Sequence, residues 1–198
     1  MEVCLPFNTC QKVFRAGDGI ADLVWFIQAV IKHHQDNLRP LNLAFVDVKK
    51  AFYSVSHQSI LAAAARLGVP PPFLGYIREL YSDAETTLRI GPELSDPIRL
   101  GRGVRQGDPL SLQLFNAVTD MCLAGLDPGL GCMVGDLRVN HGAFADDIVL
   151  FASTPRGLQT LTAELEPELA LCGLGISSGP QGKALHLDVD GRAKTPIF

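Results

Sequence analysis

The chain has 198 residues, of which 47% are hydrophobic and 19% are charged, so it has enough apolar residues to form a substantial buried core. This composition argues against an intrinsically disordered chain, and no apolar run is long enough to span a bilayer. The formal net charge is -4, which lacks the basic excess of proteins that follow a nucleic-acid backbone.

The five cysteines contain no CxxC pair, and no histidines stand at zinc-ligand spacing, so a structural zinc site is not expected. The N-terminal sequence MEVCLPFN has no basic segment followed by an apolar stretch, as a signal peptide would. An odd number of cysteines without a signal indicates reduced thiols. The sequence therefore predicts a soluble, intracellular protein of the nucleus or cytoplasm with no membrane partner.

In the first half of the chain, apolar spacing predicts an amphipathic helix, with Asp18 as its N-cap, followed by an apolar strand that carries Asp47 near its end. Two further helices are expected before a Gly-Pro turn that separates two strand-like stretches. The predicted ranges are 20–31 (helix), 41–48 (strand), 57–67 and 72–81 (helices), and 85–90 and 97–104 (strands).

In the second half, Asp108 followed by Pro109 predicts the N-terminus of a helix that extends to about residue 126. Residues 137–145 and 148–152 are expected to form a hairpin with Asp146 and Asp147 at its tip, and a last helix covers 155–171. Strands and helices in this order favour an α+β fold. We expect an antiparallel sheet with helices on one face, in a split βαβ-like plan.

Three aspartates occur at strand ends: Asp47 after the first strand, and the adjacent pair Asp146 and Asp147 inside an otherwise apolar stretch. Adjacent carboxylates are costly in apolar surroundings unless they face water or a cation. Solvated turns would explain each of them separately. If all three converge, their oxygens suit magnesium, and two such ions would support an in-line phosphoryl displacement.

A Gly-rich stretch, GRGVRQGDPLS, covers residues 101–111. Glycine permits close backbone approach to a ligand, and the arginines and glutamine offer donors for phosphates or base edges. A tight turn leading into the capped helix explains the same residues without a ligand. Both interpretations remain open at this point.

Three segments in this order, FVDVKKAF, RGVRQGDPLS and AFADDIVLF, closely resemble motifs A, B and C of reverse transcriptases. RQGDPLS resembles the non-LTR (LINE-type) retrotransposon branch in particular. QKVFR at residues 11–15 is similar to the preceding fingers motif, and residues 173–185 are similar to motif D. The resemblance therefore covers nearly the whole chain and implies a reverse-transcriptase palm.

The resemblance implies a role for each matching residue. Asp47, Asp146 and Asp147 correspond to the catalytic metal ligands, with the carbonyl of Val48 beside them, and the cofactor would be Mg²⁺, with Mn²⁺ possible. Phe52 corresponds to the aromatic residue that excludes a 2′-hydroxyl from the incoming nucleotide. The remaining matches are Gln106 and Gly107 at the nascent base pair, and Lys183 as a general acid.

The resemblance further implies RNA-directed DNA polymerase activity on an RNA template and a DNA primer, with dNTPs as substrates. It divides the chain into a partial fingers segment at 1–40, a palm at 41–185 and a C-terminal tail at 186–198, with no thumb. We expect a chain without a thumb to extend primers poorly. The alternative is a catalytically silent retroelement remnant that persists as a folded or partner-binding module. The sequence does not predict an oligomeric state.

Overall fold

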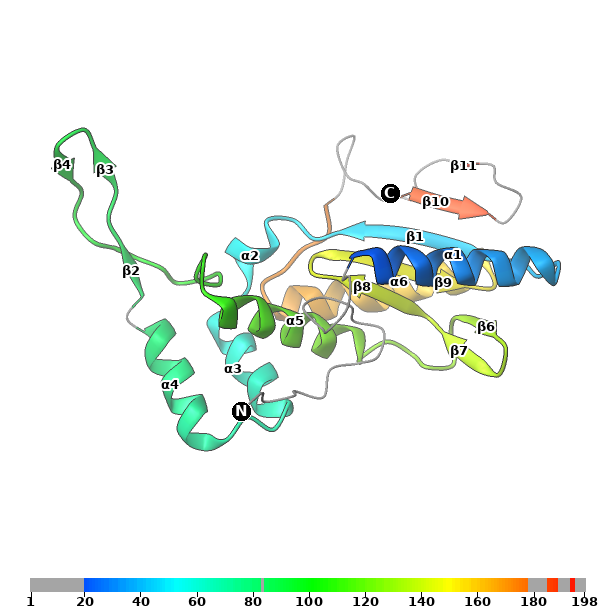
Figure 1. Cartoon of the computed structure of the whole chain (residues 1–198), viewed down its shortest axis with the longest axis horizontal. Helices are drawn as coiled ribbons and strands as arrows, with labels where there is room; N and C mark the ends of the chain where they lie inside the picture. Colours follow the sequence, from blue (N-terminus) through cyan, green and yellow to red (C-terminus); the bar gives the residue numbers. More distant parts are fainter. Residues whose placement is uncertain (1–19, 83, 178–184, 189–192, 195–198) are drawn as a thin grey trace.

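A five-stranded antiparallel sheet in the order β11-β10-β1-β9-β8 forms the centre of the fold (Figure 1). The computed structural model describes residues 20–82, 84–177, 185–188 and 193–194. The strands are β1 (Asn42–Asp47), β8 (His141–Phe144), β9 (Asp147–Ala152), β10 (Leu185–Asp188) and β11 (Ala193–Lys194). The sequences NLAFVD of β1 and DIVLFA of β9 are almost continuously apolar, as expected for strands that are covered on both faces.

Alternate residues of β1 and β9 enter two separate cores. Ala44 and Val46 belong to the larger core, beneath α5 (Pro109–Leu123) and α6 (Pro155–Leu171). Leu43 and Phe151 belong to the smaller core, beneath α1 (Ile20–Asp36). This separation follows from the two-residue period of a strand.

The prediction that helices cover one face of the sheet holds for the palm helices α5 and α6. However, α1, which the sequence assigned to the fingers segment, covers the other face. Its buried residues Leu23 and Val30 contact the sheet through the smaller core. The helix was predicted over residues 20–31 and extends to Asp36, and its proposed cap Asp18 lies outside the described residues.

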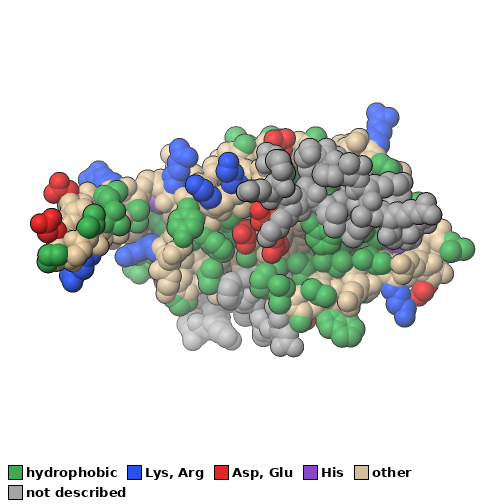
Figure 2. All heavy atoms as spheres, turned by 90° about the horizontal axis from the view of Figure 1, so that it is seen from above, with side chains coloured by type: hydrophobic (Ala, Val, Ile, Leu, Met, Phe, Trp, Pro, Cys, Tyr) green, Lys and Arg blue, Asp and Glu red, His purple; other side chains and the backbone are tan. Residues whose placement is uncertain are grey.

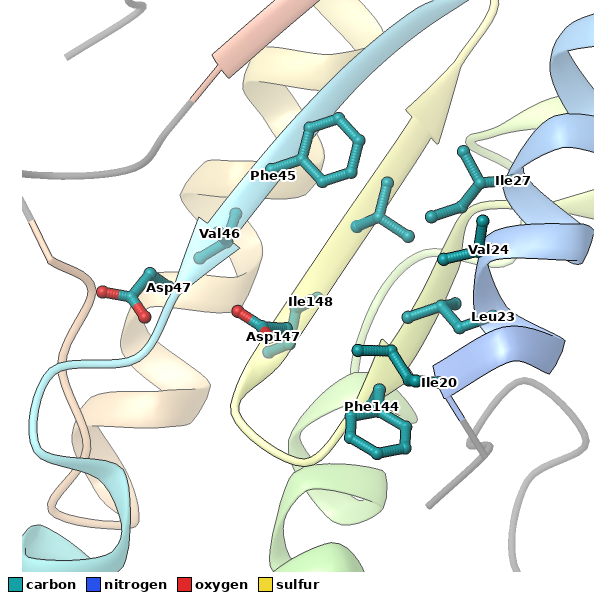
Figure 3. A pocket seen from close by; sticks show the side chains of 11 residues that line it. Ile20, Leu23, Val24, Ile27, Phe45, Val46, Asp47, Phe144, Asp147 and Ile148 are labelled. Carbon is teal, nitrogen blue, oxygen red and sulfur yellow. The ribbon is translucent and has the colours of Figure 1, made fainter. Parts of the chain in front are cut away.

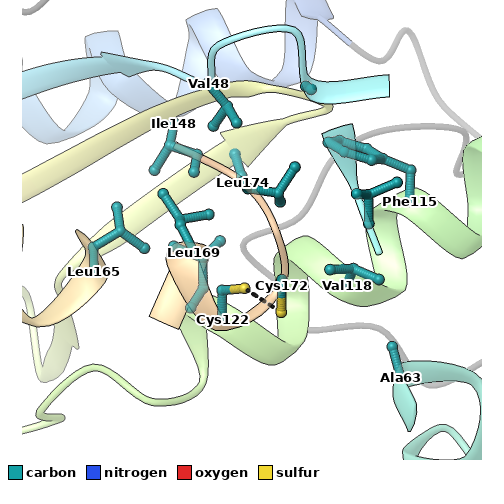
Figure 4. Packing of buried hydrophobic residues seen from close by; sticks show 14 of the residues in the cluster. Val48, Ala63, Phe115, Val118, Cys122, Ile148, Leu165, Leu169, Cys172 and Leu174 are labelled. Carbon is teal, nitrogen blue, oxygen red and sulfur yellow. Dashed lines mark hydrogen bonds between the residues drawn. The ribbon is translucent and has the colours of Figure 1, made fainter. Parts of the chain in front are cut away.

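The larger core joins α5 and α6 to α3 (His57–Arg66) and α4 (Pro71–Ser82), both of which the sequence predicted. Figure 4 shows the part of this core where α5, α6 and α3 meet the sheet. Phe115 of α5 and Leu165 of α6 are fully buried. Burial of each such side chain contributes about 1.5–3 kcal/mol relative to exposure. These helices therefore hold one face of the sheet in a fixed position.

Side-chain caps begin three of the helices. Asp108 accepts a hydrogen bond from the backbone N–H of Leu110 at 2.9 Å, with Pro109 in the first turn of α5, as predicted. Ser56 caps α3 and Thr154 caps α6 in the same way. A single helical turn, α2 (Ala51–Ser54), follows β1 shortly after Asp47. The sequence did not predict this turn.

Three predicted strand ranges differ from the structure. The stretch expected at 85–90 is divided into β2 (Glu85–Thr86) and β3 (Arg89–Ile90), and the strand expected at 97–104 is only β5 (Ile98–Arg99). Strand β2 pairs with β5 and β3 pairs with β4 (Glu93–Leu94), in an arm that projects from the fold (Figure 1). The strand expected at 137–145 is split into β7 (Leu137–Val139) and β8. Strand β7 pairs with β6 (Cys132–Val134), whereas β8 pairs with β9. The alternation of residues along a strand does not reveal which strand it pairs with, so the sequence pattern could not predict this division.

Two further helix and sheet boundaries are notable. Helix α5 ends at Leu123, before the predicted end at 126, although Leu126 is still buried in the larger core. Strand β10 pairs with β1 across the predicted start of the C-terminal tail. Among the described residues, no helix is long and apolar enough to cross a membrane.

Phe151→Ala should lower the free energy of unfolding by about 3–5 kcal/mol, because it empties a fully buried position in the smaller core. Phe151 also makes an edge-to-face contact with Phe26 of α1, with ring centroids 5.7 Å apart. Urea denaturation measures the change. Phe73→Ala, at a position that is 51% exposed, is the matched control and should cost about 1 kcal/mol or less. Equal losses in the two variants would contradict the assigned core.

Candidate active site

The pairing of β1 with β9 places two aspartates directly opposite each other. Asp47, the last residue of β1, is the register partner of Asp147, the first residue of β9. Directly opposed residues of an antiparallel pair share one face of the sheet and have Cβ atoms about 4.5–5.5 Å apart. Both carboxylates therefore lie on the α1 side of the sheet, at the ends of neighbouring strands (Figure 3).

A cavity of about 280 Å³ begins at these aspartates and continues along α1 (Figure 3). Its remaining walls are apolar and come from four elements, with Ile20 and Val24 on α1, Phe45 on β1, Phe144 at the end of β8 and Val149 on β9. Asp47 is half-buried and Asp147 is exposed. The acidic pair therefore has solvent on one side and an apolar wall on the other.

Asp146 lies in the two-residue turn that connects β8 to β9, next to Asp147. The first residue of this turn is Ala145, which has φ 54°. A two-residue hairpin turn requires a positive φ at this position, and glycine is the residue that normally adopts it. The carbonyl of Asp146 accepts a hydrogen bond of 3.4 Å from the backbone N–H of Val48. This bond holds the turn against the end of β1.

The structure thus brings the three predicted aspartates to one end of the sheet, two as an opposed pair and the third beside them. Within the described part of the chain, no three His, Cys, Asp or Glu side chains are grouped as a set that could hold a metal ion. Like charges on directly opposed residues of an antiparallel pair are destabilising, and a cation bound by both carboxylates would offset that cost.

The Gly-rich loop docks on the turn that follows β1. The backbone N–H of Val104 donates to the carbonyl of Phe52, and that of Gly103 donates to Val55, both at 2.8 Å. Gly103 has φ +86°, and a Cβ atom there would lie 2.8 Å from the Phe52 carbonyl oxygen. Only glycine fits this position without displacing α2. The ring of His57 also donates through Nε2 to the Gly103 carbonyl at 3.1 Å.

The side chains of Gln106 and Phe52 are held by different partners. The side-chain amide of Gln106 donates a 2.7 Å hydrogen bond to the hydroxyl of Tyr53, and both side chains are exposed. Phe52 is half-buried, and its ring lies 4.7 Å from that of Phe115 at an interplanar angle of 45°. Gly107 follows Gln106 with φ +83° and open space around its Cα.

The segment after α6 also reaches the aspartate end of β1. The backbone N–H of Ser177 donates to the carbonyl of Asp47 at 2.9 Å, and that of Lys49 donates to Gly175 at 2.7 Å. This is the described beginning of the range that resembles motif D. Lys183 and the segment 11–15 lie outside the described residues.

Sequence reasoning gave no structural role to Tyr53 or His57, although both link the first motif to the loop. Their contacts join residues 46 and 53 positions apart in the chain. No local pattern carries a signal for such a contact.

The strand order, the acidic strand ends and the docked loop define a polymerase palm of the reverse-transcriptase type. The fold matches telomerase from Candida tropicalis in complex with a fragment of telomeric RNA, with a TM-score of 0.67 over 92% of this chain and 31% of that one. A second structure, apo telomerase from the same organism, matches with a TM-score of 0.59. The identities are 11% and 13%, so these matches concern the fold alone.

The chain belongs to the reverse transcriptase (RNA-dependent DNA polymerase) family, whose model matches residues 2–179. It is 40% identical over 167 residues to a retrovirus-related Pol polyprotein from the type-1 retrotransposable element R2 of Nasonia vitripennis. It is 37% identical over 184 residues to that of the type-2 element R2DM of Drosophila melanogaster. These alignments cover 84% and 93% of this chain but only 16% and 17% of the relatives. The predicted non-LTR relationship is thereby confirmed.

Gly103→Ala should lower the free energy of unfolding by about 1–3 kcal/mol, because it combines a disfavoured backbone conformation with a clash against α2. Gly101→Ala is the matched control: it is in the same loop, has no positive φ, and a Cβ atom there meets nothing within 4 Å. Thermal unfolding of both variants measures the difference. If the two variants melt together, the loop does not dock as described.

Proposed function

We propose that this chain is the palm of a retroelement RNA-directed DNA polymerase, which adds dNTPs to the 3′ end of a DNA primer on an RNA template. The observation that carries the proposal is the direct opposition of Asp47 and Asp147 at adjoining strand ends, beside a docked Gly-rich loop. Membership of the reverse transcriptase family agrees with it. The proposed division is a fingers segment at 1–40, a palm at 41–185 and a tail at 186–198.

Asp47, Asp146 and Asp147, with the carbonyl of Val48, would hold Mg²⁺ or Mn²⁺. The donor set fits, because magnesium is usually bound by one or two carboxylates and completes its shell with water and substrate phosphates. When bound, such ions activate the primer hydroxyl and neutralise charge on the leaving pyrophosphate. The role of the protein is to keep its carboxylates at fixed positions on the two paired strands.

The residues around the aspartates would position the nucleotide and the template. Phe52, braced by Phe115, would exclude a 2′-hydroxyl by steric contact. Gln106, held by Tyr53, and Gly107 would lie along the nascent base pair. We propose Lys183 as the general acid toward pyrophosphate, on the basis of its resemblance to the motif D lysine.

Exposed basic residues flank the acidic site and would contact phosphates of the template, the primer or the dNTP. Lys49 and Lys50 directly follow β1, and Arg102 and Arg105 belong to the docked loop. In Figure 2, acidic side chains gather near the middle of the face shown, with Lys and Arg side chains close by. Since these partners are nucleic acids, we propose that the protein acts in the nucleus or cytoplasm.

Magnesium or manganese should raise the melting temperature of the chain, because an ion that binds only the folded state stabilises it by mass action. Asp47→Asn should remove this response, and without metal it should raise stability by about 0.2–1 kcal/mol, because it ends the repulsion with Asp147. The combined Asp146→Asn and Asp147→Asn variant should also lose the response. Scanning fluorimetry at increasing metal concentration measures both effects.

The control for the metal titration is Asp136→Asn, an exposed aspartate in the separate β6–β7 hairpin, which lies at the opposite end of β1 from Asp47 (Figure 1). It should respond to metal as the wild type does. A full response in the Asp47 variant would rule out a metal site at the strand ends.

Primer extension on poly(rA)/oligo(dT) tests the activity itself. Asp147→Asn should reduce extension by about 100-fold or more, since the metal ions contribute several kcal/mol to catalysis.

Phe52→Ala should increase the use of rNTPs relative to dNTPs by about tenfold or more, as expected for a steric contact worth about 1–3 kcal/mol. Phe52→Tyr keeps the ring and should keep the preference for dNTPs.

An unchanged nucleotide preference in Phe52→Ala would remove Phe52 from its proposed role. Metal-dependent stabilisation without any primer extension would instead support the alternative, a folded retroelement remnant that has kept its acidic site but not its activity.

A further inference from the structure

Two buried cysteines meet where α5 and α6 end. Cys122 lies in the last turn of α5, and Cys172 caps the C-terminus of α6. Their sulfur atoms are 3.5 Å apart, with the Cys122 thiol donating to the Cys172 sulfur (Figure 4). The two side chains are 1% and 4% exposed, and they are 50 positions apart in the chain. Nothing in the proposed polymerase chemistry uses either of them.

A cavity of about 440 Å³ gives small molecules a route to this pair. Both cysteines line it, together with Ser59 and Arg66 of α3 and Glu168 of α6. The carboxylate of Glu168 opposes an anionic sulfur in the cavity. The pair is therefore shielded from bulk solvent by the helices but adjoins a cavity large enough for a peroxide.

The hydrogen bond makes the two thiols unequal. It lowers the pKa of Cys172 to about 7, and a hydrogen bond from Ser59 acts in the same direction, while burial and Glu168 oppose them. The same bond to Cys172, together with burial, raises the pKa of Cys122. Because the thiolate is the reactive form of cysteine, Cys172 is the more reactive thiol of the pair.

We infer that Cys122 and Cys172 form a redox modification site, in which a peroxide converts the dithiol to a disulfide that joins α5 to α6. The Cys172 thiolate attacks one peroxide oxygen, which breaks the O–O bond and yields a Cys172 sulfenic acid and hydroxide. The Cys122 sulfur then attacks the Cys172 sulfur. The S–S bond forms, the S–O bond breaks, and the oxygen leaves as water with the Cys122 proton. The dithiol loses two electrons, and the peroxide gains them.

The geometry requires only a small movement. A disulfide needs a sulfur separation of about 2.05 Å, so the sulfurs must approach by about 1.5 Å from their hydrogen-bonded positions. Cys172 is the C-cap that directly follows α6, and it precedes Gly173, which has φ +77°. The carbonyl of Cys172 accepts a hydrogen bond from the backbone N–H of Ser56 at 2.9 Å. Oxidation would therefore tighten the segment that follows α2, next to the acidic site.

The test uses the full chain in native buffer with a modest excess of hydrogen peroxide, followed by denaturation, alkylation and a non-reduced peptide map. The expected main product is a Cys122–Cys172 cross-linked peptide, which dithiothreitol converts back to two alkylated thiols. The disulfide should raise the melting temperature by about 5–10 °C, because it closes a long loop in the unfolded chain. This readout needs no variant, so it does not depend on any variant folding.

Cys132 is the internal control, because burial raises its pKa to about 11 and it should stay fully alkylated. Cys122→Ser should leave Cys172 as a sulfenic acid that dimedone traps. A background with Cys4→Ser and Cys10→Ser removes the thiols of the N-terminal segment.

Two outcomes would overturn the inference: alkylation of both Cys122 and Cys172 after peroxide treatment, or a sulfinic acid on Cys172 beside a free Cys122 thiol. Both outcomes are read on the folded wild-type chain, independently of polymerase activity.

Discussion

The antiparallel register of β1 against β9 positions the rest of the molecule. It pairs Asn42 with Ala152 at one end and Asp47 with Asp147 at the other. A slip of one residue would turn every side chain of β1 to the opposite face, taking Asp47 away from Asp147 and Leu43 out of its core. Because helices cover both faces of this pair, such a slip would place Leu43 and Ala44 in cores shaped for other side chains and would turn the Asp47 carboxylate toward the larger core. The packing of α1 and α6 therefore determines the position of the acidic pair.

The backbone around the aspartates is held in unfavourable conformations that the surrounding sheet maintains. Three described residues other than glycine have positive φ, and two of them, Lys50 and Ala145, flank the acidic end of the sheet. Such a conformation costs roughly 1–2 kcal/mol for a residue with a Cβ atom. These two conformations determine the path of the chain at the site: Ala145 closes the hairpin that contains Asp146, and Lys50 turns the chain from β1 into α2. Strain of this kind is commonly found at functional sites.

The Gly-rich loop illustrates why two proteins can share a fold while their sequences have diverged. The loop depends on one glycine, Gly103, because the Phe52 carbonyl leaves no room for a side chain. Most core positions have no such requirement, since apolar residues of similar volume replace each other at low cost. This difference explains how a fold can match telomerase at 11% identity. The R2 relatives, at 37–40% identity, match far more of the sequence.

Local chemistry determined much of this protein from its sequence alone. The Asp108 cap, the apolar strand with Asp47 near its end and the helical periods all depend on neighbours a few residues away, and the structure has each of them. The sequence predicted Asp147 at the hairpin tip beside Asp146, whereas in the structure Asp147 is the first residue of β9. The motif resemblance added the family. What only the tertiary structure decided depends on contacts between distant segments: the cover of α1 on the second face, the split between β7 and β8, the Tyr53–Gln106 bond and the Cys122–Cys172 pair. A sequence pattern records which face of an element is apolar, but the partner of that face is selected by packing in three dimensions.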